Sequence, residues 1–432
     1  MFRIGKRVGG VGQQLANRSR AFGTKAAPPS RLRNAVWATG VVAAAGLGYV
    51  YITDASAGIH RYLSTPLMHL LDPEDAHNLS ISLLKHGIAP ADRGSDSDLL
   101  SIQLWGKQLS NPVGLAAGFD KNGEAIDSLF GLGFGAVEIG SITPEAQAGN
   151  PRPRLFRIED SRAVINRMGL NNDGAQMCAD RIRSRFWRLL AAQSQRHGET
   201  VASLAASVNR SALSSRLLGI NLSKSKTSAA DSHADYVEGL RTLGPYADYV
   251  VVNVSCPNVS NIRAGADVAV LEDTVAAVVR ARNAMPDYRP PVVLKIGPDN
   301  NNDQLRLIAQ LALDYRIDGI IATNTTPSRP QALLECETAK EFGGLSGEPL
   351  CEMALQTTRE MYRLTKGRIP IIGCGGISSA EDALRFAKAG ASMVQIYSSM
   401  VYDGPGKVRE IKDGLVDLLK GRKWSDVVGE DS

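Results

Sequence analysis

Residues 249–263, Tyr-Val-Val-Val-Asn-Val-Ser-Cys-Pro-Asn-Val-Ser-Asn-Ile-Arg, carry the clearest indication of the fold. They begin with a continuous apolar run, and a β-branched run that ends in Asn and Pro is typical of a strand buried on both faces. Asn253, Ser255, Cys256 and Asn258 follow at its carboxyl end. A thiol between two carboxamides at the mouth of a buried strand could bind a planar, amide-rich ligand and move a proton. The alternative is an ordinary strand exit with Asn as a turn former.

Seven further apolar runs repeat this pattern, each followed by a longer amphipathic stretch. The eight predicted strands are 113–117, 135–139, 217–222, 249–254, 292–296, 319–322, 369–373 and 393–396, with helices predicted at 272–283, 303–315 and 380–389 among the connections. Eight strand–helix units in about 310 residues predict an α/β fold, a closed (β/α)8 or TIM barrel. A doubly wound open sheet is the alternative, but no Gly-x-Gly-x-x-Gly follows the first run, so its dinucleotide-binding form lacks support.

The carboxyl ends of the predicted strands indicate a phosphorylated, flat cofactor, because barrel enzymes carry their chemistry there. Gly-rich segments 343–347 and 373–376, with 397–398 at the end of the last strand, let backbone N–H groups close on a phosphate. A tight turn is the alternative for either segment alone. Residues 116–118, Ala-Ala-Gly, leave room for a flat ring, and Lys295 can place positive charge beside a ring that gains electrons.

Polar side chains near the same ends indicate the substrate. Asn166, Asn253, Asn258 and Asn324 offer both donors and acceptors. Several converging carboxamides suit a cyclic imide or ureide, and Lys121 could bind its carboxylate.

The N-terminal residues predict a targeting sequence followed by a membrane anchor. Residues 1–34 hold eight Lys or Arg and no Asp or Glu, which is typical of a mitochondrial presequence, with a disordered basic tail as the alternative. Residues 35–52 are uncharged, with aromatics near both ends, and predict a transmembrane anchor, with a secretory signal core as the alternative. The preceding positive charges would stay in the matrix, which would place the remainder in the intermembrane space.

Composition argues against nucleic-acid and metal partners. Removing the eight basic residues of 1–34 from the total of 49 leaves 41 against 44 acidic residues, a net charge of −3, so the basic character belongs to the N-terminus alone. Five cysteines lie far apart with no Cys-x-x-Cys. This spacing indicates neither a zinc site nor a disulfide framework, and it is compatible with an intracellular setting.

Two segments outside the repeats have separate interpretations. Residues 60–92 predict two short helices, the second restarting at Asp72-Pro73-Glu74. Such a pair could lie on a membrane or cap the barrel, and both could hold. Residues 184–216 are rich in Ser, Ala and Arg and are interpreted as a variable surface insertion in the 100–422 barrel, without an assigned role.

Several motifs in order resemble the dihydroorotate dehydrogenase family, from about residue 62 to about residue 420. They are Ala-Ala-Gly-Phe-Asp-Lys at 116–121, Asn-Pro-Arg-Pro-Arg at 150–154, Ile-Asn-Arg-Met-Gly-Leu-Asn at 165–171, Asn-Val-Ser-Cys-Pro-Asn at 253–258, Leu-Lys-Ile at 294–296, Thr-Asn-Thr-Thr at 323–326 and Gly-Gly-Leu-Ser-Gly at 343–347. Leu-Leu-Asp-Pro-Glu-Asp-Ala-His at 70–77, with the presequence and anchor, is similar to the membrane-bound, quinone-using mitochondrial class.

The resemblance implies oxidation of dihydroorotate to orotate with FMN as hydride acceptor and ubiquinone as final acceptor, in pyrimidine biosynthesis. It implies FMN contacts from Ala116, Ala117, Gly118, Phe119, Asp120, Ser141, Asn166, Asn221, Asn253, Lys295, Thr323, Gly347, Gly376, Tyr397 and Ser398. It implies substrate contacts from Lys121, Asn166, Arg167, Met168, Gly169, Leu170, Asn253, Asn258, Asn324 and Thr325, and a quinone tunnel beside His77, Arg157 and Tyr397 under the helices of 60–92. Cys256 and Lys121 would be the catalytic residues.

One departure from the family pattern concerns the base. The membrane-bound class usually carries Ser there and the soluble class carries Cys, and this chain has Cys256. The two features indicate different acceptors. The predicted anchor favours a quinone, whereas Cys256 mildly favours a soluble acceptor such as fumarate.

Two other functions are weaker alternatives. A flavin barrel enzyme such as a hydroxy-acid oxidase needs a His at a strand end, and none of the six His stands there. A membrane-anchored binding protein without activity would be favoured by loss of Lys121, Cys256 or Lys295, and all three are present.

Overall fold

The computed structural model describes residues 31–229, 231–254 and 268–432 of the chain. The predictions for Cys256, for Asn258 and for most of the presequence concern residues outside these ranges. The chain divides into two compact units, Met1–Tyr49 and Val50–Ser432, and each is considered by itself.

A long apolar helix, α1 (Arg31–Thr53), contains the whole predicted anchor 35–52. Its segment Arg33–Thr53 has a mean hydropathy of 1.6 and carries no buried residue. By length and composition it could cross a bilayer.

Eight parallel strands close into a barrel, which confirms the predicted fold. The strands, in the order in which they pair around the barrel, are β3 (Val113–Leu115), β4 (Ala136–Ile142), β7 (Leu217–Leu222), β8 (Tyr249–Asn253), β9 (Val292–Ile296), β10 (Gly319–Ala322), β12 (Ile371–Cys374) and β13 (Ala391–Ile396). Each predicted strand corresponds to one of these, with ends shifted by up to three residues. All eight are buried over nearly their whole length, as expected for strands with helices outside and side chains inside.

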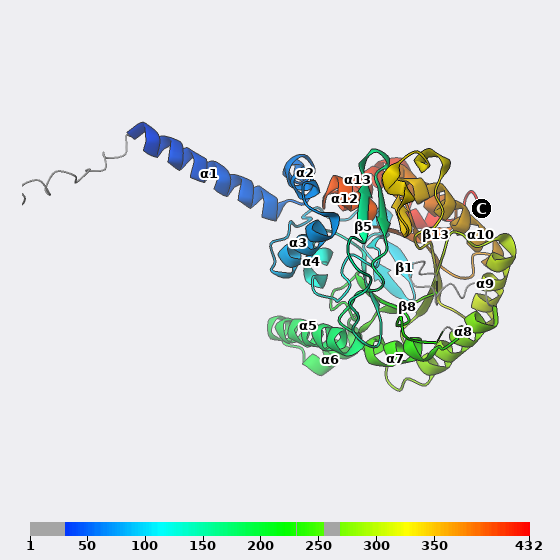
Figure 1. Cartoon of the computed structure of the whole chain (residues 1–432). Helices are drawn as coiled ribbons and strands as arrows, with labels where there is room; N and C mark the ends of the chain where they lie inside the picture. The colour runs from blue at the N-terminus through cyan, green and yellow to red at the C-terminus, as the bar shows by residue number, and fades with distance from the viewer. Residues whose placement is uncertain (1–30, 230, 255–267) are drawn as a thin grey trace, which may run out of the picture. The chain divides into compact units, whose positions relative to one another are not determined.

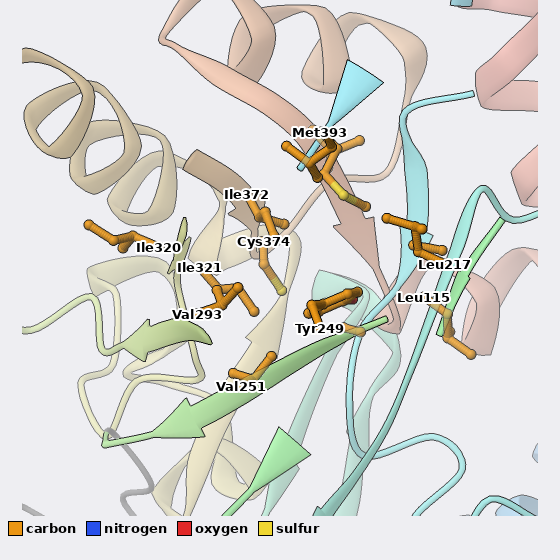
Figure 2. Close-up of a cluster of buried hydrophobic side chains, with 14 of the residues drawn as sticks. Leu115, Leu217, Tyr249, Val251, Val293, Ile320, Ile321, Ile372, Cys374 and Met393 are labelled. Carbon is orange, nitrogen blue, oxygen red and sulfur yellow. The ribbon is translucent and has the colours of Figure 1, made fainter. Parts of the chain in front are cut away.

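Large and small residues alternate in the barrel interior. A Cβ on Gly219 would overlap the ring of Tyr249, and one on Gly114 would lie 2.8 Å from Cε of Met393. Figure 2 shows Tyr249 and Met393 with buried side chains from β3, β7, β9, β10 and β12. The hairpin of β1 (Ile102–Leu104) and β2 (Lys107–Leu109) adds Trp105, whose ring centroid is 5.1 Å from that of Tyr249. The amino end of β8 is thus covered by an aromatic pair.

Helices surround the barrel, and the predicted helices at 272–283, 303–315 and 380–389 are confirmed. The helices after the first strand are α4 (Ile126–Gly131), α5 (Ala175–His197), α6 (Val201–Ser207), α7 (Ala234–Leu243), α8 (Val268–Asn283), α9 (Asn302–Asp314), α10 (Cys351–Thr365), α11 (Ala380–Lys388), α12 (Ser398–Asp403), α13 (Lys407–Leu419) and α14 (Trp424–Val427). Figure 1 shows α7, α8, α9 and α10 following one another around the outside of the strands.

The predicted helices of 60–92 are present as α2 (Thr65–His69) and α3 (Pro73–Lys85), preceded by a π-helical turn at His60–Ser64. We call α2 and α3 the helical pair. Asp72 caps α3 by accepting hydrogen bonds from the N–H groups of Glu74 and Asp75, and Pro73 occupies the first turn, where its missing N–H costs nothing.

A three-stranded antiparallel sheet was not predicted from the sequence. It joins β5 (Leu155–Ile158), β6 (Ala163–Asn166) and β11 (Gly344–Gly347) in the order β11-β6-β5. The segment 343–347 was expected to be a Gly-rich loop, but its central Leu345 is fully buried beside Ile165. Gly344 and Gly347 are therefore the end residues of a short strand.

The segment 184–216 is largely helical. Its first part continues α5 and its middle forms α6. Phe186, Leu190, Leu204 and Ala212 form a small core of their own, so this segment packs against itself beside the barrel.

Candidate active site

A cavity lies at the carboxyl ends of the barrel strands, and most of the predicted cofactor and substrate residues line it. We call it the first cavity. The predicted residues that line it are Ala116, Ala117, Gly118, Lys121, Ser141, Asn166, Met168, Gly169, Leu170, Asn253, Lys295, Thr323, Asn324, Thr325, Gly347, Gly376, Tyr397 and Ser398. Parallel strands place their carboxyl ends on one rim, which explains why residues from so many segments meet.

Glycines form one end of the first cavity. Gly347, Gly375 and Gly376 have φ values of 96°, 134° and 72°, which favour glycine. A Cβ on Gly376 would lie 2.5 Å from the backbone nitrogen of Cys351. Only a residue without a side chain lets the backbone run this close, and it leaves N–H groups accessible to an anion.

A row of hydrogen-bonded side chains runs from the lining of the first cavity into the barrel interior. Asn324 Nδ2 lies 3.4 Å from Asn253 Oδ1, and Asn253 Nδ2 donates to Ser141 Oγ at 3.2 Å. Ser141 Oγ donates to Asn221, whose Nδ2 donates to Glu138 at 2.8 Å. These contacts fix the orientation of each amide before a ligand arrives.

Glu138 is a buried carboxylate inside the barrel that sequence reasoning missed. Besides Asn221, Gln395 Nε2 donates to it at 2.6 Å and Tyr249 Oη donates at 3.3 Å. Burial raises the pKa of Tyr249 well above its ordinary value, and the charge of Glu138 acts in the same direction. The carboxylate thus orients Asn221 and Gln395 from below the cavity.

Two lysines bring positive charge to the first cavity. Lys295 is almost fully buried at the end of β9. Lys121 lies in the turn after β3, which the carboxylate of Asp120 stabilises by accepting hydrogen bonds from three backbone N–H groups. Burial lowers the pKa of Lys121 to about 8, and the nearby carboxylates of Glu74 and Asp120 oppose this. A buried cation of this kind favours an anionic ligand.

A second, mostly apolar cavity lies under the helical pair. His77, Arg157 and Tyr397, the three predicted tunnel residues, all line it, together with apolar side chains such as Leu67 and Met400. Arg157 donates to the carbonyl oxygens of His69 and Leu71 at 2.8 and 2.7 Å. It therefore fixes the end of α2 at the edge of this cavity.

The two cavities share a wall. His77, Leu155, Val164 and Tyr397 line both of them, and we call these four residues the dividing wall. The ring of Phe119 lies edge-on between the rings of His77 and Tyr397, with centroid distances of 5.5 and 5.6 Å. Two binding spaces are thus separated by one layer of side chains.

Comparison with known proteins adds the decisive observation. Residues 99–419 match the family model described as dihydroorotate dehydrogenase. The chain belongs to the dihydroorotate dehydrogenase family. Mitochondrial dihydroorotate dehydrogenase (quinone) from Mus musculus is 44% identical over 90% of this chain and 95% of its own length. The corresponding Schizosaccharomyces pombe protein is 41% identical over 90% and 89%, and dihydroorotate dehydrogenase (quinone) from Rhodospirillum rubrum is 45% identical over 84% and 92%.

Solved structures agree with this assignment. Ligand-free DHODH from Eimeria tenella superposes with a TM-score of 0.76 at 36% identity, over 83% of this chain and 99% of that one. DHODH from the same organism in complex with ferulenol gives 0.75 at 35%, over 83% and 96%. The chain is accordingly an oxidoreductase, and the resemblance noted in its motifs is confirmed.

Among the described residues, four that were predicted to contact the cofactor or the substrate do not line the first cavity. The carboxylate of Asp120 accepts hydrogen bonds within the turn after β3. Asn221 is buried beneath Ser141, from which it accepts a hydrogen bond. Arg167 pairs with Glu341, while Phe119 lines the second cavity. Family motifs mark all four, but a motif does not reveal which way each side chain points.

Sequence reasoning also missed several residues of the first cavity. They include Leu155, Arg162, Val164, Glu348 and Leu350, which lie outside the predicted segments, and Gln395. Leu155, Arg162 and Val164 come from the unpredicted antiparallel sheet and its turn. Gln395 was inside a predicted strand, and its polar side chain within an apolar run was a signal for a buried site.

Proposed function

We propose that this chain oxidises dihydroorotate to orotate with bound FMN as hydride acceptor and ubiquinone as final acceptor, as a step of pyrimidine biosynthesis. The observation that carries the proposal is the pair of cavities with a common wall. The first carries amide and hydroxyl groups and two lysines, and it suits an anionic heterocycle with a phosphorylated cofactor. The second is apolar and suits a lipid-soluble acceptor.

The first cavity fits FMN. Backbone N–H groups near Gly347 and Gly376 and the hydroxyl of Ser398 would hold the phosphate. Ala116, Ala117, Gly118, Ser141, Asn166, Asn253, Lys295 and Thr323 would contact the ring. Among the described residues, Asn171, Gln395 and Ser399 border this cavity and each has a buried polar atom without a hydrogen-bond partner, which a bound polar group would supply. When bound, FMN supplies a reversible acceptor for a hydride.

The substrate would bind beside the ring. Lys121 would pair with the carboxylate, and Asn166, Asn253, Asn324 and Thr325 would bind the cyclic amides together with the backbone of 168–170. By resemblance, Cys256 removes the proton from C5 while C6 loses its hydride, and Asn258 binds substrate. Cys256 and Asn258 lie outside the described residues.

The acceptor would enter through the helical pair. Seven large apolar side chains between Tyr62 and Ile88 are exposed, whereas only four between residues 90 and 432 are, counting the described residues. An exposed apolar surface of this density suits contact with lipid. Residues 60–92 would thus form a membrane-associated domain that admits ubiquinone to His77, Arg157 and Tyr397.

The remaining organisation follows from the N-terminus. Residues 1–34 would direct the chain to mitochondria, 35–52 would cross the inner membrane once, and the barrel of 100–422 would face the intermembrane space. Protease added to mitochondria with a ruptured outer membrane should then digest the barrel. Protection of the barrel would contradict this orientation.

Anaerobic mixing tests the activity. Dihydroorotate added to the purified holoenzyme should bleach the flavin absorbance, and a short-chain ubiquinone should restore it. Restoration only by fumarate would keep the substrate and replace the acceptor. No bleaching with flavin bound would contradict the dihydroorotate assignment.

A further inference from the structure

His77 connects the two cavities through a direct contact with Lys121. Nζ of Lys121 lies 3.1 Å from Nε2 of His77. Lys121 borders only the first cavity, whereas His77 borders both. A hydrogen-bonded pair therefore leads from the substrate side to the apolar side.

A buried ion pair and a half-exposed arginine hold this contact in place. Glu74 stands one helical turn before His77 on α3, and Arg154 donates to both of its carboxylate oxygens at 2.8 to 3.2 Å. Arg152 adds a contact of 2.9 Å. Arg154 also donates to the carbonyl oxygens of Ala148 and Asn150. Helix α3 is thus fixed to the loop before β5, and His77 is fixed on Lys121.

The surrounding charges set the protonation of the pair. Glu74, Asp120 and Arg154 face Lys121, and Lys121 is the charge that faces His77. Burial and the charge of Lys121 hold the pKa of His77 well below its ordinary value. The neutral imidazole must then accept at Nε2 from the ammonium of Lys121, which places the ring hydrogen on Nδ1.

The free ring nitrogen is available to a ligand. Within the described part of the chain, Nδ1 of His77 makes no hydrogen bond to protein. This unpartnered atom is not fully buried. Nδ1 therefore keeps some accessible surface in the space that the ring borders.

We propose that Lys121 and His77 form a proton relay that delivers one of the two protons required to convert the quinone to the quinol. This inference rests on the proposed function, because it assigns a role within the quinone half-reaction. It makes His77 a catalytic residue that touches the acceptor, and Lys121 the source of its proton.

The step balances. The quinone needs two electrons and two protons, and the reduced cofactor supplies both electrons with one proton as a hydride equivalent. Nδ1–H of His77 gives the other proton to a quinone oxygen, while Nε2 takes a proton from Nζ of Lys121. His77 remains neutral in its other tautomer, and Lys121 becomes a neutral amine. One proton from solvent then restores the pair: the Nε2 proton of His77 returns to Lys121 and Nδ1 is protonated again.

The relay also links the two half-reactions. A substrate or product carboxylate beside Lys121 stabilises its ammonium form and raises its pKa. Departure of orotate removes this carboxylate, and burial then makes Lys121 a stronger acid. The proton is thus released only after the first product has left.

His77→Gln separates a relay from a structural contact. The glutamine Oε1 can take the place of Nε2 and accept the hydrogen bond from Lys121, but it cannot pass a proton on. We expect flavin reduction by dihydroorotate to stay within twofold of wild type and reoxidation by short-chain ubiquinone to slow about 100-fold, the order expected for general acid catalysis. His86→Gln, at the exposed end of the same helix, should change neither rate.

A second readout does not depend on turnover. Acylation of Lys121 by acetic anhydride, followed by mass spectrometry across pH in the substrate-free holoenzyme, should give a midpoint near pH 8 in wild type and in His77→Gln. Normal reoxidation in His77→Gln would overturn the relay and leave His77 as a positioning residue. A midpoint above pH 10 would also overturn it, because Lys121 would then hold its proton. Failure of wild type to be bleached by dihydroorotate would instead reject the proposed function.

Discussion

At the scale of single residues, buried charges determine how the site is held. Glu74 would be costly to bury alone, but hydrogen bonds from two arginines compensate it. Burial raises the pKa of this carboxyl, and the hydrogen bonds from Arg154 and Arg152 outweigh burial, so its pKa lies below the ordinary value. Its ionised form therefore stabilises the folded chain.

Glu74→Gln should destabilise the protein by about 3 kcal/mol at pH 7, because it leaves Arg154 without its counter-charge. A carboxyl with a lowered folded pKa stabilises fully above its unfolded pKa of about 4.3, and this stabilisation is lost as the pH falls through the folded pKa. Thermal unfolding from pH 7 to pH 3 should show the difference from wild type shrinking below about pH 4. Glu352→Gln removes an exposed ion pair with Arg385 and should cost less than about 1 kcal/mol. Equal effects of the two changes would contradict the importance of burial.

Cys256→Ser should alter the pH dependence of flavin reduction. A thiol has an unperturbed pKa of about 8.5, far below that of an alcohol, and the thiolate form would be the proposed base. The wild-type rate should rise with pH and level off at a lower pH than the rate of the variant. Rapid-mixing measurements between pH 6 and pH 10 would compare the two profiles. Identical profiles would remove Cys256 from the role of base.

Sequence reasoning located site residues better than it oriented them. Lys295, Asn253 and Thr323 were placed at the cavity because parallel strands end on one rim. Asn221 was placed there too, but its side chain bonds to Glu138 beneath the cavity. The contact of Lys121 with His77 joins segments 44 residues apart, and no local pattern predicts such a meeting.

At the scale of elements, repeated units were predictable and the isolated sheet was not. Barrel strands are recognisable as apolar runs between helices. Strands β5, β6 and β11 each have four residues, and β11 pairs with β6 across about 180 residues of chain. Short strands that contain Gly and pair at long range carry little local signal.

Gly376→Ala should weaken flavin binding. The residue has φ of 72°, and a new Cβ would approach the backbone of Cys351 to 2.5 Å, so strain of about 2 kcal/mol would lower affinity about 30-fold. The flavin-to-protein absorbance ratio after gel filtration would measure this.

Gly421→Ala is the matched control for Gly376→Ala. Gly421 also has a positive φ, of 85°, but a Cβ added to it would meet no atom within 4 Å. This variant should keep its flavin. Full flavin content in Gly376→Ala would contradict the phosphate site.

At the scale of the whole molecule, the two compact units contain different features. The unit Val50–Ser432 holds both cavities, and the unit Met1–Tyr49 holds most of α1. The sequence analysis divided the chain differently, into 1–34, 35–52, 60–92 and 100–422, from the change between a basic segment, an apolar segment and the barrel repeats. Within the second unit, the shared wall between the cavities could not be predicted, because it requires α3, β5, β6 and the end of β13 in one place.

Removing residues 1–49 should affect only the half-reaction that uses a quinone held in the membrane. Flavin reduction by dihydroorotate should be unchanged, since its cavity lies within Val50–Ser432. Reoxidation by a long-chain ubiquinone in vesicles should fall at least tenfold, because the anchor no longer holds the enzyme at the lipid, whereas reoxidation by a soluble short-chain quinone should persist. Loss of both would contradict the independence of the second unit.

The exposed apolar residues of the helical pair have a kinetic consequence. If the acceptor passes from lipid into the second cavity, the enzyme meets it in two dimensions, and its effective concentration is its mole fraction in the bilayer. Adding inert phospholipid at fixed total quinone should therefore raise the apparent KM for ubiquinone in proportion to the lipid, while the KM for dihydroorotate stays constant. An apparent KM that follows only the bulk quinone concentration would mean that the acceptor arrives through water. The second substrate is then dissolved in the membrane, and its concentration is expressed per lipid molecule.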